Sequence, residues 1–525
     1  MSRDAKAEGW KPSFNPWLVT IAVTMAAFME VLDTTIVNVS LPHIAGSMSI
    51  SNDESTWALT TYLVANGIVL TISGALSRMI GRKRYFVICI SVFTLASLGC
   101  GLATEFWQLL LFRAVQGFFG GGLQPAQQAI ILDTFPPEQR GTAFSVTALA
   151  IVVAPILGPV VGGYLTDTYS WHWIFLINVP IGALTVFGVL QVVEDPPWVK
   201  EEQARRYRFD YVGLGFIVLA LAGLELTLDR GENLDWLDSN FIRVTAITSA
   251  VGFIGGIYWL TRAREPIVNL SVFTDRNFAV GSAQIGLMGF VLYGSAVLIP
   301  QFAQQQLGYN ATWSGLVLAP GAVVLVLLIP IAGKLMDVMP ARWLVAFGGL
   351  CLSAALIYSH GITPDIDYTE LAVMRGTQTI GLAFLFVPIS TIAYATLPRE
   401  LNGDATALFT MIRNVMGSVG ISVSTAMVTN HEQIRYGHMI EHLTPLYEPF
   451  NTTLQRIEQA LIDHGYSAAA AAEAAPGRIY QMLRDQVAVL AYSDAFLITA
   501  WLALVMVPLA FLFTNQKVQG GAGGH

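Results

Sequence analysis

The sequence is poor in charged residues. Only 12% of its 525 residues are Asp, Glu, Lys or Arg, whereas 54% are hydrophobic. A soluble chain of this length would carry about a quarter charged residues and would divide into several domains. The deficit extends along the whole chain and does not mark a single anchor. The composition therefore predicts a protein that lies largely within a lipid bilayer.

Several other sequence signatures are missing. The three cysteines, Cys89, Cys100 and Cys351, lie within apolar runs, so we expect them to pack in the core without a disulfide framework. No metal-ligand spacing stands out among the eight histidines, and no basic aromatic patch indicates nucleic-acid binding. No Gly-x-x-x-x-Gly-Lys-Ser/Thr loop occurs, so we expect no bound cofactor and an ion gradient as the energy source. The polar N-terminus and long first apolar run argue against a cleavable signal peptide.

Fourteen apolar runs are each long enough to cross a membrane as a helix, which takes about 20 residues. Barrel strands are about half as long and alternate in polarity. We therefore predict an all-α membrane protein with fourteen transmembrane helices. The runs are 16–42, 55–77, 85–104, 106–130, 142–166, 173–193, 210–228, 241–261, 278–305, 313–336, 343–361, 370–396, 405–429 and 489–514.

Basic residues fix the predicted orientation. If the N-terminus is cytoplasmic, the Lys and Arg residues of the short loops fall almost wholly on the cytoplasmic side, apart from Arg230 and Arg243. Loops rich in Lys and Arg face the cytoplasm, and long translocated segments such as 430–488 do not count in this rule. Both termini are therefore expected in the cytoplasm, which requires an even number of spans.

The chain repeats itself. Arg113 and Gln116 recur in the second half as Arg375 and Gln378, and three further short motifs recur in the same order at nearly constant spacing. Parallel halves of this kind place a substrate path between them near the bilayer midplane. The predicted organisation is a cytoplasmic segment 1–15, a six-helix half 16–193, a linker 194–209, an inserted helix pair 210–261, a second six-helix half 278–514 and a cytoplasmic glycine-rich tail 515–525.

The long segment 430–488 interrupts the second half and is expected in the periplasm. Apolar residues between 454 and 462 recur at helical spacing after Thr452 and Thr453, which are predicted to cap a helix. An alanine-rich stretch follows and is expected to end at Pro476-Gly477. We expect a small helical cap that leans on the transporter or on a partner.

Ionisable groups within the spans are the leading functional candidates, because each costs about 2.5–3.5 kcal/mol to insert. Asp33 lies near the middle of the first run, and Glu30 is three residues earlier, on the same helix face. Together with Arg113 in the fourth run they are the predicted proton-coupling residues, since a guanidinium that approaches and leaves a carboxylate changes its proton affinity. The alternative is a fixed bond between helices.

Polar residues inside other spans mark a predicted substrate path. Gln116 and Gln124 lie in the fourth run, where three glycines precede Gln124 and indicate an opened helix; a packing seam is the alternative. Arg413 and Asn414 lie in the thirteenth run and are expected to contact substrate or an acid. Acids near the outer ends of spans, Glu225, Asp229 and Asp494, are explained by snorkelling to the interface.

Glycine, proline and basic residues mark predicted gates. Gly158 and Pro159 are expected to bend a span, and Gly162 and Gly163 to let helices approach closely. Tight packing alone is the alternative. A short loop containing Arg82 and Lys83 is predicted to latch the two halves, or to serve as a positive-inside anchor.

Five motifs together resemble the fourteen-span drug:proton antiporters of the major facilitator superfamily. They are Leu32-Asp33-Thr-Thr-Ile-Val-Asn38-Val-x-Leu-Pro42, Gly74-Ala-Leu-Ser-Arg-Met-Ile-Gly81-Arg82-Lys83, Leu111-x-Arg113-x-x-Gln116-Gly117, Gly158-Pro159-x-x-Gly162-Gly163 and Trp173-Ile-Phe-x-Ile-Asn178-Val-Pro-Ile-Gly182. The resemblance covers nearly the whole chain. Two departures stand out: Arg78 replaces the usual acid of the signature loop, whose second-half copy keeps Asp337, and Glu30 is an additional acid beside Asp33.

The resemblance implies the major facilitator fold, with gating by Gly74, Gly81 and Asp337, and proton-coupled efflux of drug-like amphipathic molecules by alternating access. It also implies a Gram-negative inner membrane, a periplasmic membrane-fusion adaptor and a TolC-type outer-membrane channel as partners. A single-component exporter of one metabolite, such as a fatty acid or siderophore, is the alternative. A polytopic lipid-acting enzyme is a remote one, because the repeats and mid-span charges indicate a pathway.

Overall fold

The computed structural model describes residues 12–203, 209–231, 234–336 and 338–514, and these residues form helices and connecting turns without strands. The first half contains α2 to α10: α2 (Pro16–Met48), α3 (Asn52–Ser55), α4 (Trp57–Ile80), α5 (Arg82–Gly101), α6 (Phe106–Gly120), α7 (Leu123–Thr134), α8 (Pro137–Thr168), α9 (Trp173–Leu176) and α10 (Asn178–Val192). The short α11 (Pro197–Gln203) lies in the linker, and α12 (Tyr211–Arg230) and α13 (Asn240–Arg262) form the inserted pair.

The second half contains α14 (Arg276–Gln305), α15 (Ala311–Leu316), α16 (Ala319–Leu335), α17 (Ala341–Ser359), α18 (Tyr368–Ala393), α19 (Asn402–Ile440), α20 (Glu448–Asp463) and α21 (Ala468–Ala510). Short 3-10 turns η2 (Trp236–Asp238), η3 (Leu270–Thr274) and η4 (Arg399–Leu401) join the longer helices.

Local sequence signals account for several helix boundaries. Helix α2 begins at Pro16, and the side chain of the preceding residue, Asn15, accepts a hydrogen bond from the Trp17 backbone N–H. Gly81 separates α4 from α5 with a φ of 98°, a conformation that favours glycine. Ser467 caps α21 by accepting from the Ala470 N–H. These boundaries therefore follow from residues with the matching capping or backbone chemistry.

All fourteen predicted runs coincide with helices, but the count of fourteen spans is not confirmed. Among the described residues, twelve helices are long and apolar enough to cross a membrane, or thirteen if the bent α8 is one span. The run 106–130 divides at Gly121-Gly122 into α6 and α7, of 15 and 12 residues, so neither part reaches spanning length. The all-α architecture expected from the sequence is confirmed.

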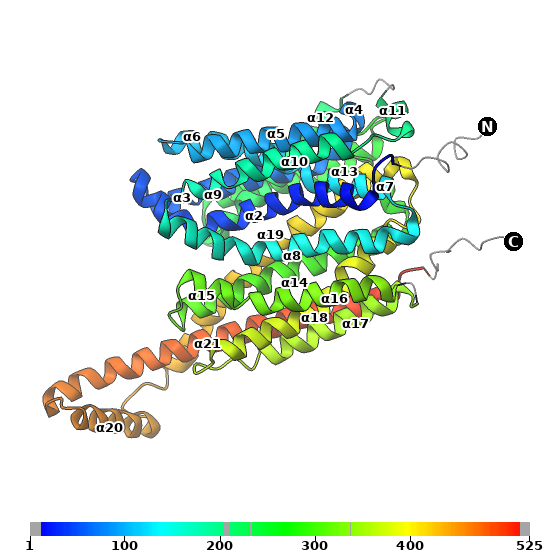
Figure 1. Ribbon diagram of the computed structural model, residues 1–525. Coiled ribbons are helices and arrows are strands. Elements are labelled where there is room, and N and C mark those ends of the chain that lie inside the picture. Colours follow the sequence, from blue (N-terminus) through cyan, green and yellow to red (C-terminus); the bar gives the residue numbers. More distant parts are fainter. Residues whose placement is uncertain (1–11, 204–208, 232–233, 337, 515–525) are drawn as a thin grey trace.

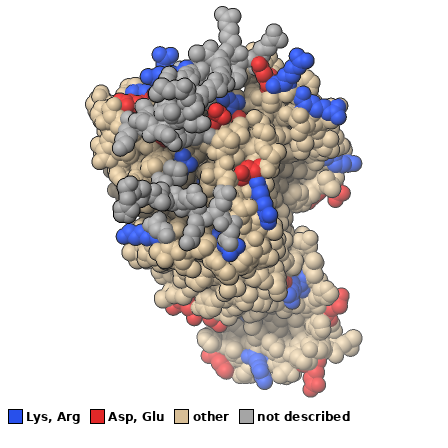
Figure 2. All heavy atoms as spheres, turned by 90° about the vertical axis from the view of Figure 1, so that its right-hand side faces the viewer, with Lys and Arg blue, Asp and Glu red and all other residues tan. Residues whose placement is uncertain are grey.

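Helix α2 begins and helix α21 ends at the same end of the bundle, which we call the inner end, and the opposite end is the outer end (Figure 1). Figure 2 shows Lys and Arg side chains around the face at the inner end. Exposed basic residues of the helices that begin or end there, and of the segment after α13, are Arg84, Lys200, Arg262, Arg264, Arg276 and Lys334. This arrangement agrees with the distribution of charge used to predict orientation.

A helical projection leaves the outer end of the bundle (Figure 1). It consists of the outer parts of α19 and α21, with α20 packed on α21. The predicted capping role of Thr452 and Thr453 is wrong: α20 begins at Glu448, and both hydroxyls bond backbone carbonyls one turn back. The predicted end at Pro476-Gly477 is also wrong, because α21 continues through both residues.

The two halves meet along two interfaces. On one, α8 packs against α15, α16 and α18; on the other, α19 packs against α4 and α7. The inserted helix α12 lies beside the second interface and contacts both α4 and α19. The buried polar residues discussed below lie between these interfaces and within the first half.

Candidate functional site

Asp33 is the centre of a closed hydrogen-bond cluster. Arg113 Nη1 donates to Asp33 Oδ2 at 2.7 Å, while Gln116 Nε2 and Asn178 Nδ2 donate to Oδ1 at 2.9 and 2.7 Å. Arg113 Nε also donates to the Ala58 carbonyl at 3.0 Å. Neither side chain of the ion pair has exposed surface. The cluster joins α2, α4, α6 and α10, and a buried pair of this kind is strongly disfavoured if one partner is lost.

Glu30 has a different set of partners from Asp33. Asn66 Nδ2 donates to Glu30 Oε1 at 3.0 Å, Tyr62 Oη donates at 3.4 Å, and Gln124 Nε2 donates to Oε2. Among the described residues, no cation lies within ion-pair distance of Glu30. The two acids thus share a helix face, as predicted, but lie in separate environments.

Tyr62 connects these two environments. Its hydroxyl contacts Glu30, and its ring lies 4.1 Å from the guanidinium carbon of Arg113. A cation over an aromatic face is attracted by the ring quadrupole. A displacement of Arg113 away from Asp33 would therefore change the contact of Arg113 with the Tyr62 ring. Through the Tyr62 hydroxyl it would also change the surroundings of the Glu30 carboxylate.

Gln124 carries the polar chain from the first half into the second. Its Oε1 accepts from Arg413 Nη2 on α19, while its amide nitrogen donates to Glu30. Arg413 also donates to Asn414 Oδ1 from Nε and Nη2, at 3.2 and 3.1 Å. Its Nη1 has no hydrogen-bond partner among the described residues although Arg413 is buried. Glu30, Gln124 and Arg413 form a connected path across the interface between the halves.

The repeat of the arginine motif in the second half lacks the acid. Arg375 Nη1 donates to Ser295 Oγ and Gln378 Oε1, both at 3.2 Å, and Gln378 Nε2 donates to Ser359 Oγ at 2.9 Å. Within the described part of the chain, no carboxylate pairs with Arg375. The buried carboxylate and arginine pair is therefore a feature of the first half.

Arg78 and Asp404 join the halves at the inner end. Arg78 Nη1 lies 2.6 Å from Asp404 Oδ1. One turn earlier on α4, Gly74 faces the backbone of Gly403, and a Cβ at Gly74 would lie 2.7 Å from the Gly403 oxygen. Arg78, which departs from the expected acid, thus meets an acid on α19. Asp337, the acid expected in the second copy of the loop, lies outside the described residues.

Arg82 and Lys83 contact the first half and the linker. Arg82 forms an ion pair with Asp133. The Lys83 ammonium donates to the Leu190 carbonyl at 2.8 Å, and its backbone N–H donates to Asp195 Oδ1 at 2.9 Å. These contacts brace α5 against α7, α10 and the linker, whereas the ion pair between Arg78 and Asp404 crosses between the halves.

Helix α8 bends by 41° between its segments Gln139–Pro155 and Leu157–Thr168. Pro159 lacks the N–H that would bond the carbonyl four residues earlier, which accounts for a bend at this place. On the opposite side of the interface, a Cβ at Gly315 of α15 would lie 3.0 Å from Pro159. The bent region therefore contacts the second half directly.

Two glycines of α8 let it lie directly on α2. A Cβ at Gly158 would lie 2.2 Å from Thr35 Oγ1, and one at Gly162 would lie 2.8 Å from Ile36 Cγ1. Gly163 is buried beside them. Thr35 and Ile36 follow Asp33 on α2, so the predicted close approach lies next to the carboxylate cluster.

Glu225 and Asp229 on α12 do not snorkel away from the bundle. Glu225 is buried, and Ser418 Oγ of α19 donates to its Oε1 at 3.2 Å. Thr60 Oγ1 of α4 donates to Asp229 Oδ2. The expectation failed because it considered the position of these acids along the helix but not the face on which they lie.

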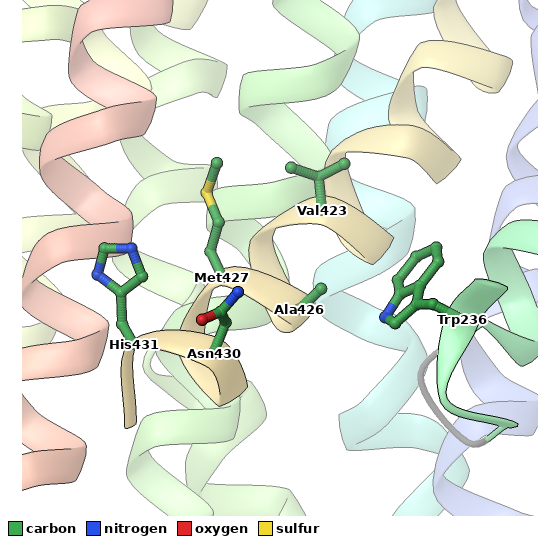
Figure 3. Close-up of a pocket in the computed structure, with 6 residues that line it drawn as sticks. All are labelled: Trp236, Val423, Ala426, Met427, Asn430 and His431. Atoms are coloured by element: carbon green, nitrogen blue, oxygen red, sulfur yellow. The ribbon is translucent and has the colours of Figure 1, made fainter. Parts of the chain in front are cut away.

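Asp494 also has specific partners. It lies 2.9 Å from Arg435 Nη2 and 3.0 Å from His431 Nδ1, both on the outer part of α19. His431 also lines a nearby cavity of about 260 Å³ (Figure 3). The cavity is lined by Trp236, Val423, Ala426, Met427, Asn430 and His431.

Four residues of these clusters were not expected as site residues: Tyr62, Asn66, Asn178 and Asp404, although Asn178 stands in one of the family motifs. The first three are polar residues inside the apolar runs 55–77 and 173–193, and this signal could have found them. Asp404 stands just before a run, where an acid is ordinary. Only its contact with Arg78 distinguishes it.

Comparison with known proteins identifies the family. Residues 23–421 match the Major Facilitator Superfamily. The chain belongs to this superfamily. Its relatives include the multidrug export protein EmrB of Escherichia coli strain K12, 34% identical over 508 residues that cover 97% of each chain. The fatty acid resistance protein FarB of Neisseria gonorrhoeae is 33% identical over the same shares of both chains.

A solved structure supports the same fold. The human organic anion transporter MFSD10 (TETRAN) aligns with a TM-score of 0.57 at 12% identity, over 94% of this chain and all of that one. The predicted major facilitator fold is thus confirmed, and the chain is a multi-span membrane transporter. Its site residues lie at the positions described above, and their roles in transport remain predictions.

Proposed function

We propose that this transporter exports amphipathic, drug-like molecules in exchange for protons by alternating access. The observation that carries the proposal is the path Glu30–Gln124–Arg413, which begins beside the Asp33 cluster and ends in the second half. Buried carboxylates can take up and release protons, and a path that crosses the interface can couple their state to the relative position of the halves. Similarity to EmrB supports the substrate class.

Asp33 is the proposed proton carrier, with Arg113 as the group that holds it in its charged form. Protonation of Asp33 weakens its attraction for Arg113 and so loosens the contact between α2 and α6. Glu30 and Arg413 face each other through Gln124, which places the second acid beside the proposed substrate path. The proton gradient is therefore the proposed energy source.

Efflux from cells tests this function. A fluorescent lipophilic cation and a weak acid serve as probes, and the gradient is collapsed with valinomycin and nigericin, since a weak-acid uncoupler could itself be exported. Gradient-dependent efflux by the wild type that is lost in Asp33→Asn, but kept in the exposed control Asp167→Asn, supports the proposal. Equal efflux by Asp33→Asn and wild type at matched expression would refute the role of Asp33.

A dedicated exporter of a fatty acid is the second candidate, because FarB is nearly as similar as EmrB. The unpartnered Nη1 of Arg413 would suit a carboxylate. Export of a long-chain fatty acid with no movement of the cationic probe would favour this candidate.

We further propose an inner-membrane location with both termini in the cytoplasm, and assembly with a periplasmic adaptor and a TolC-type outer channel. The outer projection supports this, because it exposes Leu446, Tyr466, Tyr480 and Met482 beyond the bundle. Apolar side chains exposed together often mark a protein interface. Co-purification of an adaptor that is lost when residues 446–466 are replaced by a short linker, with transport by the purified protein retained, would support the contact.

A further inference from the structure

The inserted helix α12 bridges the two halves near the outer end. On its α4 side, Asp229 accepts from Thr60, and Arg230 lies 4.5 Å from the Trp57 ring and 3.6 Å from Asp229. The contacts that reach α4 are a hydrogen bond to the Asp229 carboxylate and a cation–π pair, and the ion pair between Asp229 and Arg230 lies within α12. Helix α12 is thus attached to the first half by charged as well as apolar contacts.

On its α19 side, α12 is held by two hydroxyl groups. Ser418 Oγ donates to Glu225 Oε1 at 3.2 Å, and Ser422 Oγ donates to the Leu228 carbonyl at 2.9 Å. Helix α12 also packs less extensively against α19 than against α4. We call this contact the outer seam. Because α12 packs more extensively on α4, we expect the outer seam to be the place where α12 parts from the second half when the halves move.

Glu225 lies in the outer seam without a compensating charge. Its side chain is only 8% exposed, and no cation of the described residues lies within ion-pair distance. The nearest charged groups on α12 are Asp229 and Arg230, which pair with each other. Arg413, the next cation along α19, is bonded to Gln124 and Asn414.

Within the described part of the chain, the other elements packed against α12 bond it at this level through uncharged groups. The residues of α4 and α13 that bond α12 here are Thr60, Thr245 and Ser249, all uncharged. An ionised carboxylate buried without a cation is expensive, and it avoids the cost by taking a proton or by reaching water. The closed seam therefore requires a proton on Glu225.

A cavity lies next to the outer seam along α19. From the residue directly after Ser422, α19 lines the cavity of about 260 Å³ with Val423, Ala426 and Met427, and Trp236 of the segment after α12 also lines it (Figure 3). Water at this end therefore needs to cross little packed protein to reach the seam.

We propose that Glu225 is a second proton-binding carboxyl group, separate from the Asp33 cluster, and that its ionisation opens the outer seam. When the seam is open, the carboxylate takes a proton from outer water, loses its charge and returns beneath Ser418. This rests on the proposed proton-coupled function and orientation, and it gives the inserted pair a role in access to the outer side.

Cysteine labelling in intact cells tests the seam without any drug. Ser422→Cys is the reporter, and its labelling by a membrane-impermeant maleimide is counted above the background of the native cysteines. Because thiol reactivity itself rises with pH, rates are compared between variants at the same pH. At outer pH 8 the reporter chain is expected to label at least threefold faster than the same chain with Glu225→Gln, and at pH 5.5 the two rates converge.

Matched variants separate this mechanism from a folding defect. Asp238→Asn removes an exposed acid of the same hairpin and is expected to label like the reporter chain, and Glu225→Asp keeps the pH dependence. Ser418→Ala, which keeps the carboxyl group but removes its donor, is expected to label faster at pH 5.5. Equal rates for Glu225→Gln and the reporter chain at pH 8, or no effect of Ser418→Ala, would overturn the proposal. Wild-type efflux that does not depend on the proton gradient would instead refute the proposed function.

Discussion

Replacement of Arg113 by glutamine is expected to destabilise the transporter through Asp33. The substitution removes the guanidinium that lies 2.7 Å from Asp33 Oδ2 and leaves the amides of Gln116 and Asn178 as donors. Breaking a buried ion pair by removing one partner costs about 3–5 kcal/mol, because a bare charge remains. The double variant Arg113→Gln/Asp33→Asn removes that charge and should recover most of the loss.

The assay is unfolding of purified protein by SDS in mixed micelles, followed by tryptophan fluorescence. Arg375→Gln is the matched control, since Arg375 occupies the repeat-related position but bonds neutral groups. The penalty of Arg113→Gln should shrink at low pH, where a proton on Asp33 removes the bare charge. A double variant as unstable as Arg113→Gln, or a penalty no larger than that of Arg375→Gln, would refute the reasoning.

Two further predictions concern closure at the inner end. Gly74→Ala places a methyl group 2.7 Å from the Gly403 oxygen, so it should slow transport at least tenfold. The control Gly67→Ala, whose methyl group would have nothing within 4 Å, should leave the transport rate unchanged. Equal transport rates for the two variants would contradict this. Arg78→Asp and Asp404→Arg should each reduce efflux by placing like charges together, and the double exchange should restore efflux because the 2.6 Å ion pair is re-formed in reverse. A double variant as inactive as the single ones would contradict a role of this ion pair in closing the inner end.

The sequence was sufficient to predict the helical bundle and the residues that stand out as charges within apolar runs. Asp33 and Arg113 could be expected together because mid-span charges need partners, whereas Gln116 was predicted to line the substrate path and bonds Asp33 instead. Their actual geometry, with Asn178 as a third donor to the carboxylate, depends on how α10 packs against α2. Spacing along one helix carries no information about that packing.

Other contacts could not be predicted because they join distant segments. The ion pair of Arg78 with Asp404 and the path from Glu30 to Arg413 each cross from one half to the other. The prediction that Glu225 snorkels to the interface was wrong for the same reason. Its position near the helix end indicated the interface, but Glu225 lies on the face of α12 that packs against α19. The division of run 106–130 lies at the glycines that indicated an opened helix, but the contact of Gly121 with the backbone of α4 could not be read from the sequence.

Exchange of substrate for protons by the purified protein tests the central claim most directly. In proteoliposomes with a pH-sensitive dye inside and an imposed inward proton gradient, the account predicts that an exported drug accelerates proton movement through the wild type. It predicts no drug-dependent movement through Asp33→Asn and normal movement through Asp167→Asn. Drug-dependent proton movement that persists in Asp33→Asn would contradict the account.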